Sequence, residues 1–374
     1  MPQTIHKSEV VVIGAGAVGA SIAYQLARRG KDVTLLDKSE PGRGTSHTNF
    51  GLVWTQTGNN HRYVDFAIQS TLLWPELVNE LGEDVDFRPG GGLSLCLTED
   101  DLARRAAQLE EQRKSVLFEG RMLTPEEVFE IQPGVSREIL GALWSPHDGD
   151  VNWVKWTEAL LRGCRRAGIH LMAHTPVLEI VHDSQSVIQG VMTPAGRIDA
   201  EQVVVAAGIW SKQLLAEVGI AIDLYPLRGQ ILVTEPTEMI CPLAMSTVRQ
   251  EPHGRFFMGV TYEEVGFDRS ITPEAYHAIR DHAAKLVPAT QDLQVMTHFA
   301  GLRPMPGDGL PIVGPIEQMP GLYVAVGHAG ITLSPIHGRV ISDLIVEGET
   351  PYAIDEYDPM RFKDGTFGTA IRVL

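Results

Sequence analysis

The sequence predicts an α/β protein in which a Rossmann-like nucleotide-binding domain is interrupted by a second, α+β domain. Three observations support this prediction. The chain has 374 residues, which is more than one typical hydrophobic core accommodates. Residues 10–19 combine an apolar strand with a Gly-x-Gly-x-x-Gly loop. Apolar strands that run into glycine return at Gly208 and Gly327, so the nucleotide-binding domain is expected to consist of three separated stretches.

The first of these stretches has the pattern of a strand, a turn and a helix that bind phosphate groups. Val10–Ile13 is an apolar run typical of a buried parallel strand. Gly14 permits a tight turn, Gly16 allows a pyrophosphate to approach the backbone, and Gly19 allows close packing of helix and strand. The next strand ends at Asp37, whose carboxylate can accept a hydrogen bond from a ribose hydroxyl. The flanking strands and this acidic residue favour the interpretation over an ordinary glycine-rich turn.

Periodicity, glycines and capping residues predict the remaining elements. The first helix is expected to end at Gly30. Three further helices are expected to begin after Thr98, Thr124 and Thr272, whose side chains can cap them. A Pro-Ala-Gly turn at residues 194–196 predicts a hairpin. Other expected helices are residues 63–81, 153–167 and 338–347, and other expected strands are residues 33–36, 93–97, 169–173, 177–182, 187–192, 203–206 and 322–326.

Composition disfavours several classes of protein. The net charge of −16 at pH 7 argues against a nucleic-acid partner, which requires a basic face. Cys96, Cys164 and Cys241 form no Cys-x-x-Cys pair, so we expect a reducing compartment, no disulfide framework and no metal site. No apolar run reaches the roughly 18 residues that span a bilayer, and the early first strand leaves no room for a cleavable signal. A cytoplasmic protein is expected, and peripheral membrane association stays open.

Four stretches of the chain together carry a family resemblance. They are the fingerprint of residues 14–37, the segment Gly44–Asn49, the strand Val203–Gly208 and the C-terminal segment Gly301–Thr332. With them the chain resembles the D-amino-acid oxidase superfamily of FAD-dependent amine and amino-acid oxidoreductases, and it is most similar to glycine oxidase and sarcosine oxidase β-type subunits. In residues 45–54 and 327–332 it further resembles the FAD subunits of heteromeric opine oxidase, hydrogen cyanide synthase and D-hydroxyproline dehydrogenase.

The resemblance implies a two-domain flavoprotein fold of the glutathione reductase type. Residues 1–85, 148–222 and 301–374 are expected to form a discontinuous, Rossmann-like FAD-binding domain. Residues 86–147 and 223–300 are expected to form an interleaved α+β substrate domain.

The resemblance also implies which residues bind FAD. Thr45 and Ser46 are expected to bond the pyrophosphate or ribityl chain, and Val177 to flank the adenine through its backbone. The turn of residues 327–332 is expected to direct N–H groups at the flavin C2 carbonyl oxygen, where they stabilise the charge of reduced flavin. No cysteine follows Cys241, so we expect non-covalent FAD. The expected set is Gly14, Gly16, Gly19, Asp37, Lys38, Thr45, Ser46, Asn49, Gly51, Val177, Gly208, Gly327, Gly330, Ile331 and Thr332.

Substrate binding is expected at Arg303, in a Gly-Leu-Arg-Pro segment that clamps the substrate carboxylate in glycine oxidase through two parallel hydrogen bonds. A structural ion pair with Asp308 is the alternative. Arg249 is either a ligand for a second carboxylate, as an opine would require, or a surface arginine. Thr247 stands where glycine oxidase carries a tyrosine, which indicates a differently shaped acid. The other expected substrate-binding residues are Trp54, His253, Tyr262 and His328, of which the last is alternatively structural.

These residues imply FAD-dependent oxidation of an amino acid or secondary amine that carries a carboxylate. Hydride transfer from Cα to flavin N5 requires orientation and desolvation, so no general base is assigned. The expected protein is a catalytic subunit whose partner subunits carry flavin and iron–sulfur centres and relay electrons. The alternatives are a stand-alone glycine- or sarcosine-type oxidase that produces hydrogen peroxide, and a non-catalytic FAD subunit that relays electrons. The three-part nucleotide-binding domain disfavours a nicotinamide-dependent dehydrogenase.

Overall fold

The largest sheet of the computed structural model, which describes residues 3–57 and 61–362, is built around β1 (Thr4–Ile13). This strand pairs in parallel with β2 (Val33–Leu36) on one side and with β12 (Gly196–Val205) on the other. The remaining strands of the sheet are β9 (His170–Met172), β10 (Glu179–His182), β11 (Ile188–Thr193), β18 (Ile312–Pro315) and β19 (Leu322–Val326). Their order is β10-β11-β12-β1-β2-β9, and β19 pairs with both β12 and β18.

Parallel pairing brings the carboxyl ends of several strands to one edge of this sheet. Ile13 at the end of β1 pairs with Leu36 of β2 and with Val205 of β12, and β19 also runs parallel to β12. The hairpin predicted at residues 194–196 is confirmed, because Thr193 of β11 pairs with Gly196 of β12. Ligands of open α/β sheets bind outside the carboxyl ends of the strands, so this edge is the place to look for a site.

Helices cover the sheet, and two glycines allow them to pack closely. A Cβ on Gly19 would lie 1.8 Å from the Gly14 carbonyl oxygen, so the first helix can lie against the preceding turn. A Cβ on Gly338 would lie 2.5 Å from Ser21 Oγ, where two helices meet. The helices of this region are α1 (Ala17–Arg28), α2 (His61–Leu81), α5 (Trp153–Arg166), α6 (Ser211–Glu217) and α8 (Ser334–Val346), with the 3-10 helices η1 (Gly208–Trp210), η3 (Asp355–Tyr357) and η4 (Pro359–Phe362).

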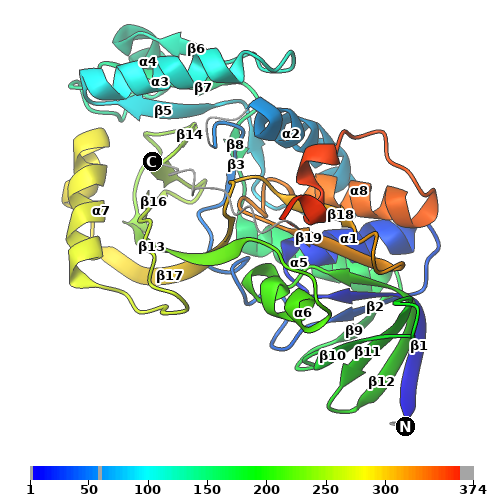
Figure 1. The fold of residues 1–374 in the computed structure, drawn as a ribbon. Helices are drawn as coiled ribbons and strands as arrows, with labels where there is room; N and C mark the ends of the chain where they lie inside the picture. Colours follow the sequence, from blue (N-terminus) through cyan, green and yellow to red (C-terminus); the bar gives the residue numbers. More distant parts are fainter. Residues whose placement is uncertain (1–2, 58–60, 363–374) are drawn as a thin grey trace.

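Two four-stranded sheets lie beyond the carboxyl-end edge (Figure 1). The first has the order β15-β16-β13-β17 and contains β13 (Leu224–Pro236), β15 (Val248–Gln250), β16 (Arg255–Gly259) and β17 (Val295–Pro306). The second has the order β14-β5-β7-β6 and contains β5 (Gly92–Cys96), β6 (Arg121–Leu123), β7 (Gly141–Ser145) and β14 (Ala244–Met245). The parallel pair of β14 and β5 joins the two chain segments that contribute to this region.

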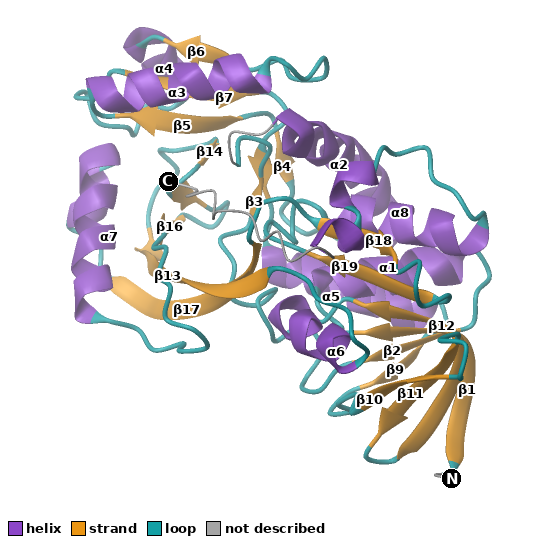
Figure 2. Cartoon of the chain, viewed as in Figure 1, coloured by secondary structure: helices purple, strands orange, loops and turns teal. Residues whose placement is uncertain are grey.

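The helices of this region pack beside its sheets. Figure 2 shows α3 and α4 next to the sheet that contains β5, and α7 beside the far ends of β13 and β17. A small sheet with the strand order β3-β8-β4 lies between the two regions. The bounds are α3 (Glu99–Gln112), α4 (Pro125–Ile131), α7 (Pro273–Leu286), η2 (Pro288–Gln291), β3 (Leu52–Val53), β4 (Arg88–Pro89) and β8 (Gly149–Asp150).

The predicted helix starts are confirmed. Thr98 Oγ1 accepts a hydrogen bond from Asp101 N at 3.1 Å, and the Asp101 carboxylate accepts one from Thr98 N at 3.1 Å. Thr124 and Glu127 form the same reciprocal pair at the start of α4, and Thr272 caps α7. Capping residues act within a few positions of the chain, which is why the sequence alone identifies these starts.

Three expectations differ from the structure. The last long helix begins at Ser334 rather than near residue 338, because Pro335 occupies its first turn, where a missing N–H group needs no partner. The strand expected at residues 177–182 begins at Glu179, so Val177 precedes it. The expected boundary between residues 300 and 301 falls within the single strand β17, and the division of the chain into two domains stays a prediction.

Candidate active site

A cavity of about 820 Å³ lies at the carboxyl-end edge of the large sheet and extends between the two smaller four-stranded sheets. One part is lined by Gly14, Gly16 and the segment after β2, and another by side chains of α3 and α7. Arg303 of β17 and His328, which follows β19, also line it. The cavity therefore joins the predicted nucleotide site and the predicted substrate site in one space.

The loop between β1 and α1 is shaped by a hydroxyl from a distant segment. Gly14 has a φ of +105°, which side-chain-bearing residues rarely adopt. Ser46 Oγ accepts a hydrogen bond from Ala17 N at 3.0 Å, in the first turn of α1. A Cβ on Gly16 would lie 2.9 Å from the same oxygen. Gly16 and Ser46 both line the cavity, whereas Gly19 is used for helix packing.

Asp37 holds the glycine loop in place. One of its carboxylate oxygens accepts from Ala15 N at 2.9 Å, and the other accepts from Ser39 N at 2.9 Å. A carboxylate has about four acceptor positions, so capacity remains for a ligand hydroxyl. Lys38 Nζ lies 3.3 Å from the ring centroid of Trp210, and both residues line the cavity. Burial lowers the pKa of Lys38, while the neighbouring Asp37 raises it.

The segment before β3 separates into cavity-lining and structural residues. Thr45 lines the cavity, and its Oγ1 donates to Leu302 O at 2.6 Å. Asn49 also lines the cavity, and its Oδ1 accepts from Gly51 N at 2.8 Å. The structure places Gly51 outside the cavity lining, with a φ of +77° and with Val151 O 2.5 Å from a Cβ built on it. Gly51 is thus needed for a turn and for close packing.

Three further predicted regions reach the cavity. Val177 and Gly208 line it, and Gly208 has a φ of +56° at the start of η1. Gly327, Gly330, Ile331 and Thr332, which lie between β19 and α8, also line it. Thr332 is 1% exposed, and its Oγ1 accepts from Trp54 N at 3.0 Å. This bond joins the turn to Trp54, another predicted and cavity-lining residue.

Arg303 lies in the cavity without an acidic partner among the described residues. Its Nη1 donates to Thr261 O at 3.0 Å, and its Cζ lies 4.8 Å from the ring centroid of Tyr262. A Cβ on Gly229 would lie 2.2 Å from Arg303 Nη2, so Gly229 makes room for the guanidinium. The alternative ion pair with Asp308 is not formed, because the Asp308 carboxylate accepts from Arg361 at 2.7 Å.

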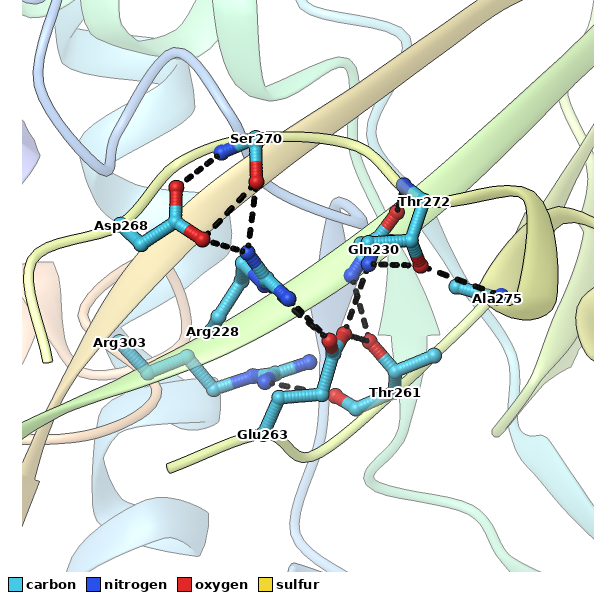
Figure 3. A network of polar contacts seen from close by, with 9 residues as sticks. All are labelled: Arg228, Gln230, Thr261, Glu263, Asp268, Ser270, Thr272, Ala275 and Arg303. Atoms are coloured by element: carbon cyan, nitrogen blue, oxygen red, sulfur yellow. Dashed lines mark hydrogen bonds and ion pairs between the residues drawn. The ribbon is translucent and has the colours of Figure 1, made fainter. Parts of the chain in front are cut away.

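A polar network holds the Thr261–Glu263 segment, whose Thr261 carbonyl oxygen accepts a hydrogen bond from Arg303 (Figure 3). The Arg228 side chain, only 4% exposed, donates to Glu263 Oε2 at 2.5 Å and to Asp268 at 2.6 Å. The other oxygen of Glu263 accepts from Gln230 Nε2 at 2.9 Å and from the Thr261 hydroxyl. Since Thr261 O binds Arg303, the network orders the segment that carries both Arg303 contacts.

His328 lines the cavity beside Arg303. Burial and the positive charge of Arg303 together lower the pKa of His328 to about 3. The imidazole is therefore neutral at physiological pH and adds no second positive charge beside the guanidinium. The sequence left open whether His328 binds substrate or supports the turn, and its place in the cavity is compatible with both roles.

Two predicted substrate-binding residues lie away from the cavity. Arg249 is 1% exposed, donates from Nε to Phe50 O at 2.5 Å and lies 3.5 Å from Asp150. It is neither a surface arginine nor a cavity-lining residue, because aromatic rings enclose it, with Phe257 at 4.7 Å. The His253 side chain is 66% exposed and lies 3.8 Å from Asp86, outside the cavity lining.

Several cavity-lining side chains of α3 and α7 were not expected from the sequence. Arg105 and Gln108 come from α3, and His282 comes from α7, where its Nε2 lies 3.1 Å from Thr247 Oγ1. A signal for the first group was present, because Asp101, Arg105 and Gln108 are spaced four and three residues apart and so share one helix face. Their position over a cavity depends on the packing of α3 and was not visible in the sequence.

Comparison with known proteins identifies the family. The family model described as "FAD dependent oxidoreductase" matches residues 9–344. The chain belongs to this FAD-dependent oxidoreductase family. Glycine oxidase of Geobacillus kaustophilus (strain HTA426) is 31% identical over 377 residues, which cover 95% of this chain and 97% of the relative. One of the opine oxidase subunits of Agrobacterium tumefaciens (strain Ach5) is 30% identical, with 96% of this chain and 98% of the relative covered.

A solved structure confirms the predicted fold class of this FAD-dependent oxidoreductase. L-proline dehydrogenase from P. horikoshii superposes with a TM-score of 0.89 at 29% identity, covering 96% of this chain and 99% of that one. The predicted superfamily, the FAD cofactor and the activity as an oxidoreductase of amino acids and amines are likewise confirmed.

The cavity of the oxidoreductase fits FAD. Gly16 lines the cavity and has no side chain, so a ligand can approach its backbone, and the start of α1 favours the negative charge of phosphates. Asp37, Thr45 and Ser46 add polar atoms in the same part of the cavity. The turn of residues 327–332 lines the same cavity as Arg303.

Three further findings concern metals, thiols and membranes. Within residues 3–57 and 61–362, no three His, Cys, Asp or Glu side chains gather as metal ligands. All three cysteines of the chain are buried and unpaired. Over the same described ranges, no helix combines the length and the apolar character needed to cross a membrane.

Proposed function

We propose that this chain oxidises the Cα–N bond of an amino acid or secondary amine whose carboxylate is bound by Arg303. The observation that carries the proposal is the Arg303 guanidinium, which lies in the FAD-sized cavity without an acidic partner among the described residues. Leaving a partly buried guanidinium unneutralised is costly, and a substrate carboxylate would offset that cost with two parallel hydrogen bonds.

The side chains around Arg303 have separate tasks in this mechanism. FAD, when bound, supplies the acceptor for the hydride that leaves the substrate Cα. Arg303 fixes the carboxylate and thereby orients the Cα–H bond. The guanidinium lies over the Tyr262 ring, and neutral His328 adds no second positive charge that would compete with Arg303 for the substrate carboxylate. Water then hydrolyses the imine product, a step that needs no side chain as nucleophile.

We further infer that the chain acts as the catalytic subunit of a heteromeric dehydrogenase whose partner subunits pass electrons onward. The support is its 30% identity, over nearly the full length, to a protein named as one of the subunits of opine oxidase. The similar identity to glycine oxidase supports the alternative of a stand-alone oxidase that produces hydrogen peroxide. A reducing, cytoplasmic location is part of the proposal and is supported by the unpaired state of the three cysteines.

A substrate screen tests the proposal. The purified FAD-loaded chain is supplied with amino acids and N-alkyl amino acids, with an artificial electron acceptor or with oxygen alone. We expect acceptor reduction with amines that carry a carboxylate, and none with the same amines after amidation of that carboxylate. Rapid hydrogen peroxide formation by the lone chain would favour the stand-alone oxidase. Absence of turnover on every amine, with FAD bound, would favour the non-catalytic relay subunit.

A further inference from the structure

The part of the cavity beneath α3 contains a second arginine that the proposed mechanism does not use. Arg105 lines the cavity together with Gln108 of the same helix and with Ser94 of β5. Its Nη1 donates to Gln108 Oε1 at 2.6 Å, and Gln108 Nε2 donates to Gln56 O at 2.7 Å. This chain of bonds ties the guanidinium to the cavity wall.

The charge of Arg105 has no acidic partner among residues 3–57 and 61–362. The acid nearest in sequence, Asp101, already accepts from the backbone N–H groups of Leu97 and Thr98 and pairs with Arg104. Burial lowers the pKa of Arg105, which means that its charge is partly desolvated without full compensation. An arginine keeps its charge under such conditions and so favours an anionic ligand.

Unpartnered polar atoms point to a ligand in the same place. Ser94 is 1% exposed, lines the cavity, and its Oγ has no hydrogen-bond partner in the described structure. Gln56 is 3% exposed, and its Oε1 is likewise without a partner there. Buried polar atoms are normally satisfied, so such atoms beside a charged side chain indicate a missing polar ligand. The Ser94 hydroxyl can donate to an oxyanion.

Arg105 and Arg303 face the same cavity, and Tyr262 lies within electrostatic reach of both. The net charge of the chain is −16, yet neither Arg105 nor Arg303 forms an ion pair with an acid among the described residues, and the cavity-lining Arg43 and Arg269 likewise form none. Arg249, the residue first considered for a second carboxylate, is enclosed by aromatic rings elsewhere.

We propose that Arg105 and Ser94 form a subsite for a second carboxylate of the substrate, at the end of the molecule remote from the carboxylate bound by Arg303. The inference rests on the proposed function, because Arg303 has to hold the first carboxylate. The substrate class is then a dicarboxylic amine, either an N-(carboxyalkyl) amino acid or an acidic amino acid. The second carboxylate adds binding energy without taking part in bond breaking.

Matched substrates test this subsite. N-(carboxyalkyl)glycines with one to three methylenes are compared with N-alkylglycines of the same length, and aspartate and glutamate are compared with their uncharged isosteres. We expect wild-type kcat/KM to favour one dicarboxylate series. Arg105→Met removes one partner of the charge pair that the second carboxylate would form. We therefore expect it to lower kcat/KM for the dicarboxylate by about 30-fold or more. The matched monocarboxylate should change by less than about threefold, since it leaves the subsite empty.

Arg104→Met is the matched control, because it removes the same charge from the neighbouring, half-exposed position. It should keep the preference for dicarboxylates. Absorbance of bound FAD and circular dichroism verify that each variant is folded and loaded. A wild-type enzyme without any preference, or a preference that survives in Arg105→Met, would overturn the subsite. If Arg104→Met lost the preference and Arg105→Met kept it, the second carboxylate would be bound by Arg104, and the proposal for Arg105 would be wrong.

A binding measurement separates this proposal from the proposed function. Glutarate and butyrate carry no amine, so neither is oxidised, and they differ by one carboxylate. Tyr262 and Trp54 in the cavity provide an intrinsic fluorescence signal for a titration. We expect the wild type to bind glutarate more tightly than butyrate. We expect Arg105→Met to bind the two compounds with equal affinity. This result would support the subsite even if the enzyme oxidised no amine. If the enzyme oxidised amines but bound glutarate and butyrate equally, the subsite would be refuted and the proposed function would stand.

Discussion

The guanidinium of Arg303 lies over the ring of Tyr262, with 4.8 Å between Arg303 Cζ and the ring centroid. The residue before this tyrosine, Thr261, accepts a hydrogen bond from Arg303 Nη1 through its carbonyl oxygen. Two consecutive residues therefore position one guanidinium: the Tyr262 ring contacts its face, and the Thr261 carbonyl oxygen accepts a hydrogen bond from its edge. The arrangement leaves further N–H donors of Arg303 for a ligand in the cavity.

Replacement of Arg303 should separate substrate binding from cofactor binding. Truncating one partner of a buried charge pair costs about 2–5 kcal/mol, so Arg303→Ala should weaken substrate binding by roughly 30- to several-thousand-fold. Arg303→Lys should recover little, because an ammonium group cannot form two parallel hydrogen bonds with a carboxylate. Steady-state kinetics and the FAD content of the purified variants measure both effects. Normal substrate binding in Arg303→Ala would refute its role.

Glu263 should act as a positioning residue. Glu263→Gln keeps the size of the side chain but removes the charge that neutralises the buried Arg228. The Thr261–Tyr262 segment should loosen, and KM should rise by roughly tenfold, equivalent to about 1.4 kcal/mol, with a smaller change in kcat. Asp268→Asn is the control, since the Asp268 side chain is 50% exposed and its pair with Arg228 is better screened. Equal effects of the two variants on KM would contradict this assignment.

Arg249 should contribute to stability rather than to substrate binding. It lies between the Phe50 carbonyl oxygen and the buried Asp150 carboxylate. Arg249→Met leaves these acceptors short of a donor and should lower the free energy of unfolding by about 3–5 kcal/mol. Urea unfolding measures this loss, and KM of the remaining folded enzyme should stay within about twofold, because Arg249 does not line the cavity. A raised KM with an unchanged free energy of unfolding would contradict this prediction and would indicate that Arg249 contributes to substrate binding.

Gly16 should be required for FAD binding. In Gly16→Ala the new methyl group would lie 2.9 Å from Ser46 Oγ, which itself accepts from Ala17 N. The clash should displace either the loop or Ser46 and lower FAD occupancy, measured from the ratio of flavin to protein absorbance. Adding Ser46→Ala should relieve the contact and restore part of the occupancy. If the double variant binds less FAD than Gly16→Ala, a ligand contact of Ser46 outweighs the clash.

The stability of the protein should depend on pH through Asp148. This residue is 1% exposed, and burial raises the pKa of its carboxyl from 3.8 to about 7, although Thr55 and Gln56 donate hydrogen bonds to it. The folded state binds the proton more tightly than the unfolded state does. Its contribution to stability is therefore complete below about pH 4 and is lost as the pH rises through about 7.

Asp148→Asn has no such titration and isolates the effect. Between about pH 4 and pH 7 the free energy of unfolding of the wild type should fall relative to that of Asp148→Asn. Urea unfolding at a series of pH values gives both curves, and other carboxylates cancel in their difference. A difference that does not vary with pH would show that Asp148 stays ionised in the folded protein.

The sequence by itself determined the parts of the protein that depend on near neighbours in the chain. The strand, glycine loop and helix of residues 10–28, the acidic residue Asp37, and the capped helix starts at Thr98 and Thr124 were predicted because each pattern is complete within a short segment. The family resemblance located Arg303, whose surroundings then had to come from the structure.

Only the tertiary structure decided which polar side chains share the cavity. The sequence suggested Arg249 as an anion ligand and did not single out Arg105, yet packing buries the first against Phe257 and places the second in the cavity. Gly51 proved to serve a turn rather than the cavity lining for the same reason. Side-chain environment depends on contacts between segments far apart in the chain, and a single sequence contains no measure of those distances.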